Sequence, residues 1–237
     1  MPGCDPDSLN PPVEMRLRSP IALAAAAAAL LILFALAHWV YSGYKARELQ
    51  SAAAALVAVA TARASDTLRP QESGAGELER LEGHFQAVTA ATQRLAGLEG
   101  WRNPPLIDAA QQYLDEVHAL LRRQIAVLSS RHAVLADVEL LAEHLRAARG
   151  RSSEWIRSAV TLKQQLERDF FDFRLAAGGL QKSFQALADA RRELAPLLAS
   201  TPLIEERLLA DARARLDKTS AHLAREVEAA GKLPVAR

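Results

Sequence analysis

The sequence predicts an all-α protein, with a single N-terminal transmembrane helix followed by an elongated antiparallel helical bundle that contains a long hairpin. Ala, Leu, Arg, Glu and Lys account for 131 of the 237 residues, whereas Val, Ile and Thr account for only 25. This bias is typical of long helices and coiled coils and argues against a sheet-based domain. An unbroken apolar run near the N-terminus and heptad spacings further along the chain support the same prediction.

Net charge and cysteine content exclude several classes of protein. The formal net charge is +1, so the chain lacks the basic excess of a protein that binds nucleic acid through its phosphates. A single cysteine rules out a disulfide framework and any Cys-rich metal site. This residue, Cys4, precedes the apolar run, so it cannot be a lipoprotein cysteine, and we expect it to be an inert thiol.

Residues 1–19 are predicted to be a disordered tail. They contain four of the eleven prolines together with Gly3, Asp5, Asp7 and Asn10, and Pro20 follows directly. A mis-assigned start is the alternative interpretation, with translation beginning at Met15.

Residues 20–44 are predicted to be a transmembrane anchor. Every residue from Ile21 to Ala37 is apolar, and about 21 helical positions span roughly 30 Å, the thickness of the hydrocarbon core of a bilayer. Arginines precede the run, while Trp39, Tyr41 and Tyr44 follow it, where amphipathic rings favour the headgroup region.

A cleaved signal peptide is the competing interpretation of this segment. Ala35-Leu36-Ala37 is a small-x-small site, and a start at Met15 would supply a basic n-region. The apolar run is longer than a usual signal-peptide core, which favours a retained anchor. We expect the N-terminus in the cytoplasm and most of the chain outside it, on the periplasmic side of a bacterial cytoplasmic membrane.

Residues 45–233 are predicted to form the bundle. Prolines and glycines divide them into helices over 45–68, 77–99, 105–149, 152–198 and 202–230. The third and fourth helices are of similar length and meet at Gly150, so they should pack as an antiparallel hairpin.

The fourth helix carries the strongest periodic signal in the chain. It contains two series of residues spaced by seven positions, and eleven of these thirteen positions are apolar. The first series is Ala159, Leu166, Phe173, Leu180, Leu187 and Leu194; the second is Ile156, Lys163, Phe170, Ala177, Phe184, Arg191 and Leu198.

No motif for catalysis or cofactor binding emerges. The chain has no Gly-x-Ser-x-Gly elbow, no Gly-rich phosphate loop and no Cys–His pair, so we expect a protein that is not an enzyme. Asp115 and His118 approach the spacing of a di-iron helix motif, but no second copy exists. We therefore expect no catalytic residue, no cofactor and no metal.

Two groups of residues are candidates for binding. Arg146, Arg149 and Arg151 flank Gly150 at the predicted hairpin tip and could contact an anionic partner or lipid headgroups, although a solvated face is the alternative. Phe170, Phe173, Gly178, Gly179 and Phe184 form the second group. Two mid-helix glycines cost about 1 kcal/mol each relative to alanine, so a ligand pocket or dimer contact competes with a simple core layer here.

The segment from Phe173 to Phe184, with the sequence FRLAAGGLQKSF, resembles the late-helix segment of double all-helical ligand-binding (DAHL-type) sensor domains. In that family the segment places Phe, a basic residue, a small residue and Leu at similar spacing. The resemblance implies an extracytoplasmic ligand-binding module behind a transmembrane helix. The family normally continues into a second transmembrane helix and an output module, and here the sequence ends at Arg237 without either.

These observations predict a single-pass, membrane-anchored, non-enzymatic envelope protein. It would act by binding a small-molecule ligand or a protein, as a sensor-like module without its own output domain. The alternative function is a structural spacer or assembly factor of a membrane complex, in which the apolar stripes serve packing or homodimer formation. The expected partners are the membrane and a protein partner or second copy, with no nucleic acid.

Overall fold

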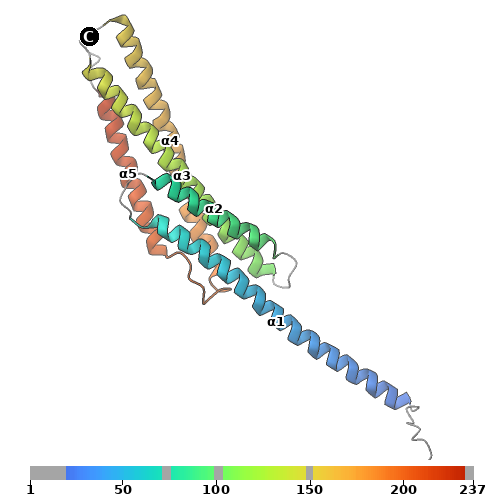
Figure 1. The fold of residues 1–237 in the computed structure, drawn as a ribbon. Helices are drawn as coiled ribbons and strands as arrows, with labels where there is room; N and C mark the ends of the chain where they lie inside the picture. The colour runs from blue at the N-terminus through green and yellow to red at the C-terminus, as the bar shows by residue number, and fades with distance from the viewer. Residues whose placement is uncertain (1–19, 71–75, 99–103, 148–151, 233–237) are drawn as a thin grey trace, which may run out of the picture. The chain divides into compact units, whose positions relative to one another are not determined.

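The computed structural model describes residues 20–70, 76–98, 104–147 and 152–232, and within these ranges the secondary structure is entirely helical. The five helices are α1 (Pro20–Leu68), α2 (Glu77–Ala96), α3 (Pro104–Arg146), α4 (Ser153–Leu194) and α5 (Glu206–Lys232), as Figure 1 shows. The predicted all-α fold is confirmed. The chain divides into two compact units, residues 1–45 and 46–237, and α1 contributes to both.

The described part of the first unit is the apolar half of α1. Its large side chains from Leu30 to Tyr44 are between 53% and 74% exposed, on every side of the helix. The segment of α1 from Leu30 to Tyr44 therefore has no polar face. Among the described residues, one helix, within Ala24–Leu68, is long and apolar enough to cross a membrane.

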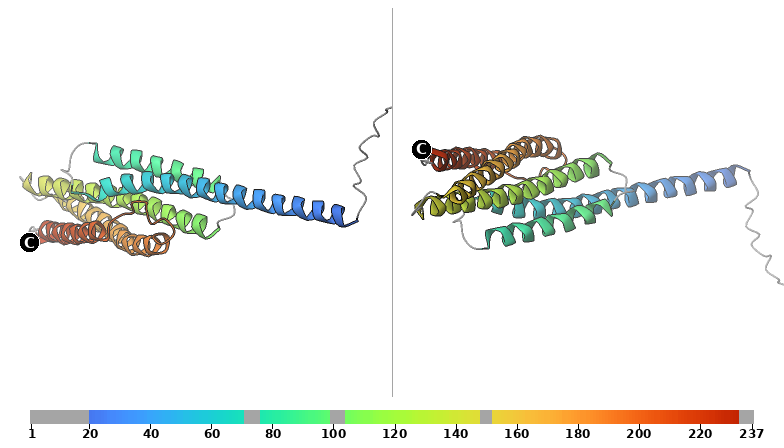
Figure 2. Two further views of the ribbon diagram at one scale, coloured as in Figure 1. Left: turned by 90° about the horizontal axis from the view of Figure 1, so that it is seen from below. Right: turned by 90° about the horizontal axis from the view of Figure 1, so that it is seen from above.

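The second unit is built around α3. This helix packs against α2 on one side and against α4 and α5 on the other, as both views in Figure 2 show. α3 and α4 contain 43 and 42 residues, which corresponds to about 64 Å each. They run in opposite directions along an extensive contact, so the predicted antiparallel hairpin is present.

The second half of α1 has one buried face within this unit. Its buried residues follow one another at intervals of four or three, which places them on one side of the helix. They are Leu49, Ala53, Val57, Ala60, Ala64 and Leu68. Three of the six are alanines with no exposed surface, so the backbone of α1 can approach its neighbours closely.

The core side of α4 follows the first predicted heptad series. All six of its residues are buried, from Ala159 to Leu194. The second series is buried at Ala177 and Phe184, and again at Leu198, which follows the end of α4. Ile156, near the start of α4, is 40% exposed.

Local sequence explains where two of the helices begin. Gly76 has a φ of 94°, a left-handed conformation that glycine adopts without steric cost, and its carbonyl accepts the N–H of Arg80 at 3.0 Å. Ser152 caps α4, because its side-chain oxygen accepts the backbone N–H of Trp155 at 3.1 Å.

The helix ends differ from those expected at several positions. α2 ends at Ala96 rather than at residue 99, and α4 ends at Leu194 rather than at residue 198. α5 begins at Glu206, four residues later than the proline-based prediction. Its start is displaced because the N–H of Ile204 donates to the hydroxyl of Tyr113 in α3. The predicted tail at 1–19 and the turn residue Gly150 lie outside the described residues.

Candidate functional site

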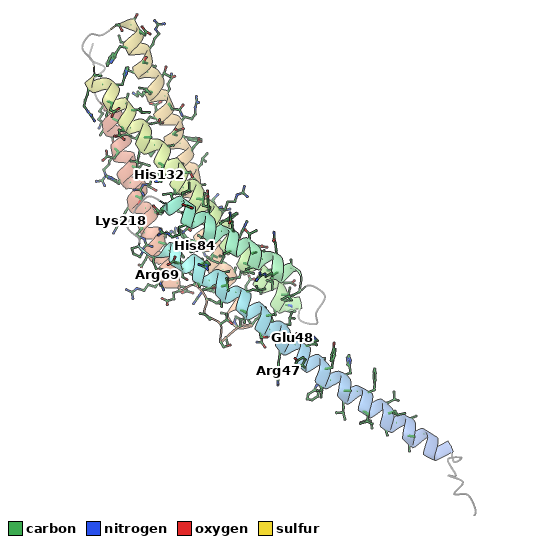
Figure 3. All side chains as sticks on the ribbon, in the orientation of Figure 1. Arg47, Glu48, Arg69, His84, His132 and Lys218 are labelled. Carbon is green, nitrogen blue, oxygen red and sulfur yellow. The ribbon has the colours of Figure 1, made fainter. Side chains whose placement is uncertain are left out.

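A groove lies along the second half of α1, on the side that faces the connection between α4 and α5. Its volume is about 790 Å³. It is lined by the α1 segment from Ala58 to Arg69, by residues between Pro202 and Leu208, and by His84 of α2. Figure 3 labels His84, in the first half of α2, and Arg69, which directly follows the end of α1.

A fully buried tyrosine shapes one wall of the groove. The Tyr113 hydroxyl lies 2.9 Å from Oγ1 of Thr61, which lines the groove, and accepts the Ile204 N–H at 3.2 Å. One side chain of α3 thus joins α1 to the α4–α5 connection. Burial raises the pKa of the Tyr113 phenol above its ordinary value of 10.0, so the hydroxyl stays neutral at physiological pH.

An imidazole–carboxylate pair forms the end of the groove. Nε2 of His84 lies 3.2 Å from Oδ2 of Asp66, and His84 is only 8% exposed. Asp66 is half-buried on α1 and lines the same groove. The exposed guanidinium groups of Arg63 and Arg69 stand nearby on the α1 side.

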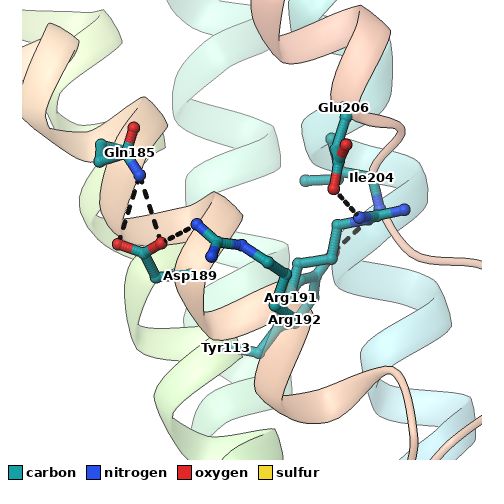
Figure 4. A network of polar contacts seen from close by, with 7 residues as sticks. All are labelled: Tyr113, Gln185, Asp189, Arg191, Arg192, Ile204 and Glu206. Atoms are coloured by element: carbon teal, nitrogen blue, oxygen red, sulfur yellow. Dashed lines mark hydrogen bonds and ion pairs between the residues drawn. The ribbon is translucent and has the colours of Figure 1, made fainter.

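The opposite edge of the groove carries acidic groups. Glu205 is exposed there, and the next residue, Glu206, pairs with Arg191 of α4 at 2.5 Å. Figure 4 shows this ion pair across the α4–α5 connection. The groove therefore offers cationic groups from α1 and a carboxylate from the connection, together with the hydroxyls of Thr61 and Ser65.

A smaller hollow of about 170 Å³ lies beyond the end of α1. It combines an apolar lining, which includes Leu81 and Leu180, with the charged groups of Arg80 and Arg131. Polar contacts fix the end of α1 beside it. Thr67 donates to Oε1 of Gln124 at 3.0 Å, and Arg215 of α5 donates to the Leu68 carbonyl.

The second group of predicted binding residues, on α4, does not form one surface, because its members lie on different sides of the helix. Phe173 is fully buried and Phe184 is 5% exposed, so both belong to the core. Phe170 is half-buried and stacks on Phe173 with the ring centres 6.4 Å apart. Gly178 has no neighbouring atom where a Cβ would be, which leaves open space on its side.

Gly179 faces α3 and the side chain of Arg123. This arginine donates to the Gly179 carbonyl at 3.1 Å and to the hydroxyl of buried Ser183. A Cβ at position 179 would lie 3.7 Å from the arginine Cδ, which is an ordinary contact. The second glycine of the pair therefore lies beside a polar contact between helices and lines no pocket.

The predicted tip residues are described only in part. Arg146, the last residue of α3, is exposed, whereas Arg149 and Arg151 lie outside the described residues. The helices are joined near this end by His144 and Trp155, whose rings stack 5.2 Å apart. Each of the two side chains also hydrogen-bonds the other residue's backbone carbonyl.

Sequence reasoning missed two large apolar side chains on the outer side of α4. Phe171 is 59% exposed and Leu175 is 62% exposed. Neither residue belongs to either heptad series. Large apolar residues outside both series were the sign in the sequence that this side of α4 also carries apolar surface. The contact between His84 and Asp66 was also missed, because the two residues belong to different helices and share no motif.

Within the described ranges, no group of three or more His, Cys, Asp or Glu side chains is arranged to hold a metal ion. No protein-family model matches the chain. Searches among curated proteins and among solved structures also find no significant match.

Proposed function

We propose that this chain is a single-pass, membrane-anchored protein whose helical bundle acts by binding a ligand or protein and catalyses no reaction. One observation supports the anchor above all others, namely the change of surface along α1. From Leu30 to Tyr44 the large apolar side chains are exposed all round, whereas from Leu49 onward one face of the helix is buried and, of the large apolar side chains, Val59 is exposed. Exposed apolar surface on every side suits lipid rather than water.

The same segment also has the length and composition of a signal sequence. Retention is favoured in the proposal because α1 continues as one helix through the apolar run into the bundle. Cleavage after Ala37 would divide this helix. The proposed location is the cytoplasmic membrane of a bacterium, with the bundle in the periplasm.

The groove beside α1 supports the binding role. It presents guanidinium groups, a carboxylate and hydroxyls on the wall of a hollow large enough for a small polar ligand or a peptide side chain. Polar groups elsewhere in the unit, such as Arg123 and Ser183, are engaged in a contact between helices. A sensor-like role rests further on the resemblance of residues 173–184 to DAHL-type domains.

Protease treatment of spheroplasts tests anchor and topology together. The expected result is digestion of the bundle to a small protected fragment, with the uncut chain resisting alkaline extraction from membranes. A mature chain that starts at His38 and is released on extraction would contradict the anchor. Complete protection until lysis would contradict the periplasmic location.

Site-specific photo-crosslinking tests the binding role. A photoreactive amino acid replaces Arg63 or Arg69 in the groove, and a matched chain carries it at Arg207, an exposed arginine outside the groove. The groove positions should yield an adduct that the Arg207 position does not, and mass spectrometry identifies it. Equal labelling at all three positions would contradict a binding role for the groove.

The alternative function, a spacer or assembly factor, is favoured by a different observation. The outward side of α4 carries exposed apolar residues that the second unit leaves uncovered. Such a surface suits association with another helix. Under this alternative the groove positions give no adduct, whereas positions on α4 do.

A further inference from the structure

We propose that the outward side of α4 is a self-association surface, on which α4 of a second copy packs in the antiparallel direction. Its apolar residues are Ile156, Val160, Phe171 and Leu175, which are 40%, 46%, 59% and 62% exposed. Phe171 is two positions before the buried Phe173, so the two rings point to nearly opposite sides of the helix. The proposal is independent of the membrane anchor and of the groove.

The residues of this surface repeat at the spacing of a helix–helix contact. Successive intervals of three or four positions place them on one side of α4. In chain order they are Gln164, Glu167, Phe171, Leu175, Gly178, Lys182 and Gln185. We call these seven residues the outer stripe.

Six residues of the outer stripe form self-complementary pairs about the midpoint between Arg174 and Leu175, and Leu175 lies beside this midpoint. A two-fold axis through this point places each residue opposite the one equally far beyond the midpoint in the second copy. Phe171 then faces Gly178 of the second copy. Gly178 has no side chain, and no atom lies within 4 Å of the position that a Cβ would take there. A large exposed ring on one helix thus meets a gap on the other, twice per dimer.

Charge selects the antiparallel direction. The same axis places exposed Glu167 opposite exposed Lys182, again twice, and pairs the amides of Gln164 and Gln185. A parallel, in-register pair would instead place Glu167 against Glu167 and Lys182 against Lys182. Opposed like charges are unfavourable across a helix interface, whereas opposite charges direct pairing.

The size of the surface predicts a weak association. The outer stripe covers 22 residues from Gln164 to Gln185, about 33 Å of helix. A single helix pair of this length is at the small end of specific interfaces, below about 1,200 Å² in total. We therefore expect a reversible dimer whose population depends on protein concentration.

Sedimentation equilibrium of the full chain in density-matched detergent micelles measures this association, in a medium where no shared bilayer fixes the directions of the two chains. Gly178→Gln should weaken the dimer at least about tenfold, because the new side chain fills the gap that Phe171 enters. Glutamine forms helices better than glycine, so the variant should remain folded. Gly83→Gln on α2 is the control, since Gly83 is also helical and also has no atom within 4 Å of the position of a Cβ, and this variant should leave the dimer unchanged.

Charge exchange and cross-linking test whether the two α4 helices pair in the antiparallel direction. Glu167→Lys or Lys182→Glu alone should weaken the dimer, and the double variant should restore it. In a Cys4→Ser background, a mixture of Glu167→Cys and Lys182→Cys chains should form a disulfide dimer on mild oxidation, while neither chain should do so alone. Homotypic cross-links, a dimer indifferent to Gly178→Gln, or a monomer at every concentration would each overturn the proposal.

Discussion

The hydroxyl of Tyr113 accepts the backbone N–H of Ile204 at a separation of 91 positions in the sequence. The same oxygen hydrogen-bonds Thr61, so α1, α3 and the α4–α5 connection meet at one buried atom. Because Ile204 lies in the segment that precedes α5, this contact also sets where the last helix begins. The wall of the groove therefore depends on a single phenol.

Tyr113→Phe should destabilise the protein by about 1–3 kcal/mol. The substitution keeps the ring but leaves the Thr61 hydroxyl and the Ile204 N–H buried without this partner. Denaturant unfolding monitored by circular dichroism measures the loss. A change below about 0.5 kcal/mol would mean that water replaces the phenol, and Tyr41→Phe in the first unit serves as the control.

Ionisation of the buried Tyr113 phenol should destabilise the protein at alkaline pH. Its pKa is raised in the folded state by burial, so its contribution is complete below the ordinary value of 10.0 and is lost as pH rises through the folded value. Above about pH 10, the stability of the wild-type protein should therefore fall more steeply with pH than that of Tyr113→Phe. Parallel slopes for the two proteins would show that Tyr113 is not responsible.

Asp137→Asn should stabilise the protein at neutral pH. Burial raises the pKa of Asp137, and a hydrogen bond and charge repulsion from Asp169 raise it further. Since the folded pKa lies above the unfolded value of 3.8, this carboxyl contributes fully below that value, and the contribution is lost as pH rises through the folded pKa.

The gain for this variant should be at most about 1 kcal/mol, because solvent screens partly exposed charges. Thermal unfolding at pH 7 and at about pH 3 measures it, and the gain should vanish at the acidic pH, where the Asp137 carboxyl is protonated. Asp172→Asn, at an exposed position of α4, should show no such difference. An equal gain at both pH values would contradict the assignment to charge.

Gly179→Ala should raise stability by about 0.5–1 kcal/mol. Alanine favours the helix interior over glycine, and the added Cβ would meet Arg123 at an ordinary contact distance of 3.7 Å. The melting temperature measures the gain, with Gly83→Ala as the comparison. A lower melting temperature would indicate that the backbones of α3 and α4 approach more closely at this point.

Trp155→Phe should loosen the end of the α3–α4 hairpin without unfolding the bundle. Phenylalanine can still stack on His144, but it cannot donate to the His144 carbonyl as the indole N–H does. Loss of one such hydrogen bond, about 1 kcal/mol, should speed amide exchange several-fold at the start of α4. Exchange around Leu187, which is fully buried, should not change.

Most of the fold could be predicted from the sequence because it rests on local pattern. Apolar spacing predicted each of the five helices and the inward series of α4, from Ala159 to Leu194. The start of α5 could not be predicted, since it depends on a hydrogen bond from Ile204 to a residue in another helix. Proline and serine near position 201 suggested an earlier start.

The candidate site was much less predictable. Aromatic density in α4 drew attention to Phe173 and Phe184, whose periodic positions place them in the core. The groove is instead formed by α1, by His84 of α2 and by a connection more than 100 residues further along the chain. A surface assembled from distant segments leaves no pattern in any one of them, so only the packed structure could reveal it.

The hydrogen bond from Arg215 to the Leu68 carbonyl has a consequence for biogenesis. During translation α1 leaves the ribosome first, and Tyr113, which contacts its buried face, follows 45 residues after α1 ends. The side chain that holds the end of α1 arrives 147 positions after the carbonyl it contacts. The buried face of α1 can therefore be contacted by Tyr113 when only half of the chain has been made, whereas the hydrogen bond at its end can form only after Arg215 has been added.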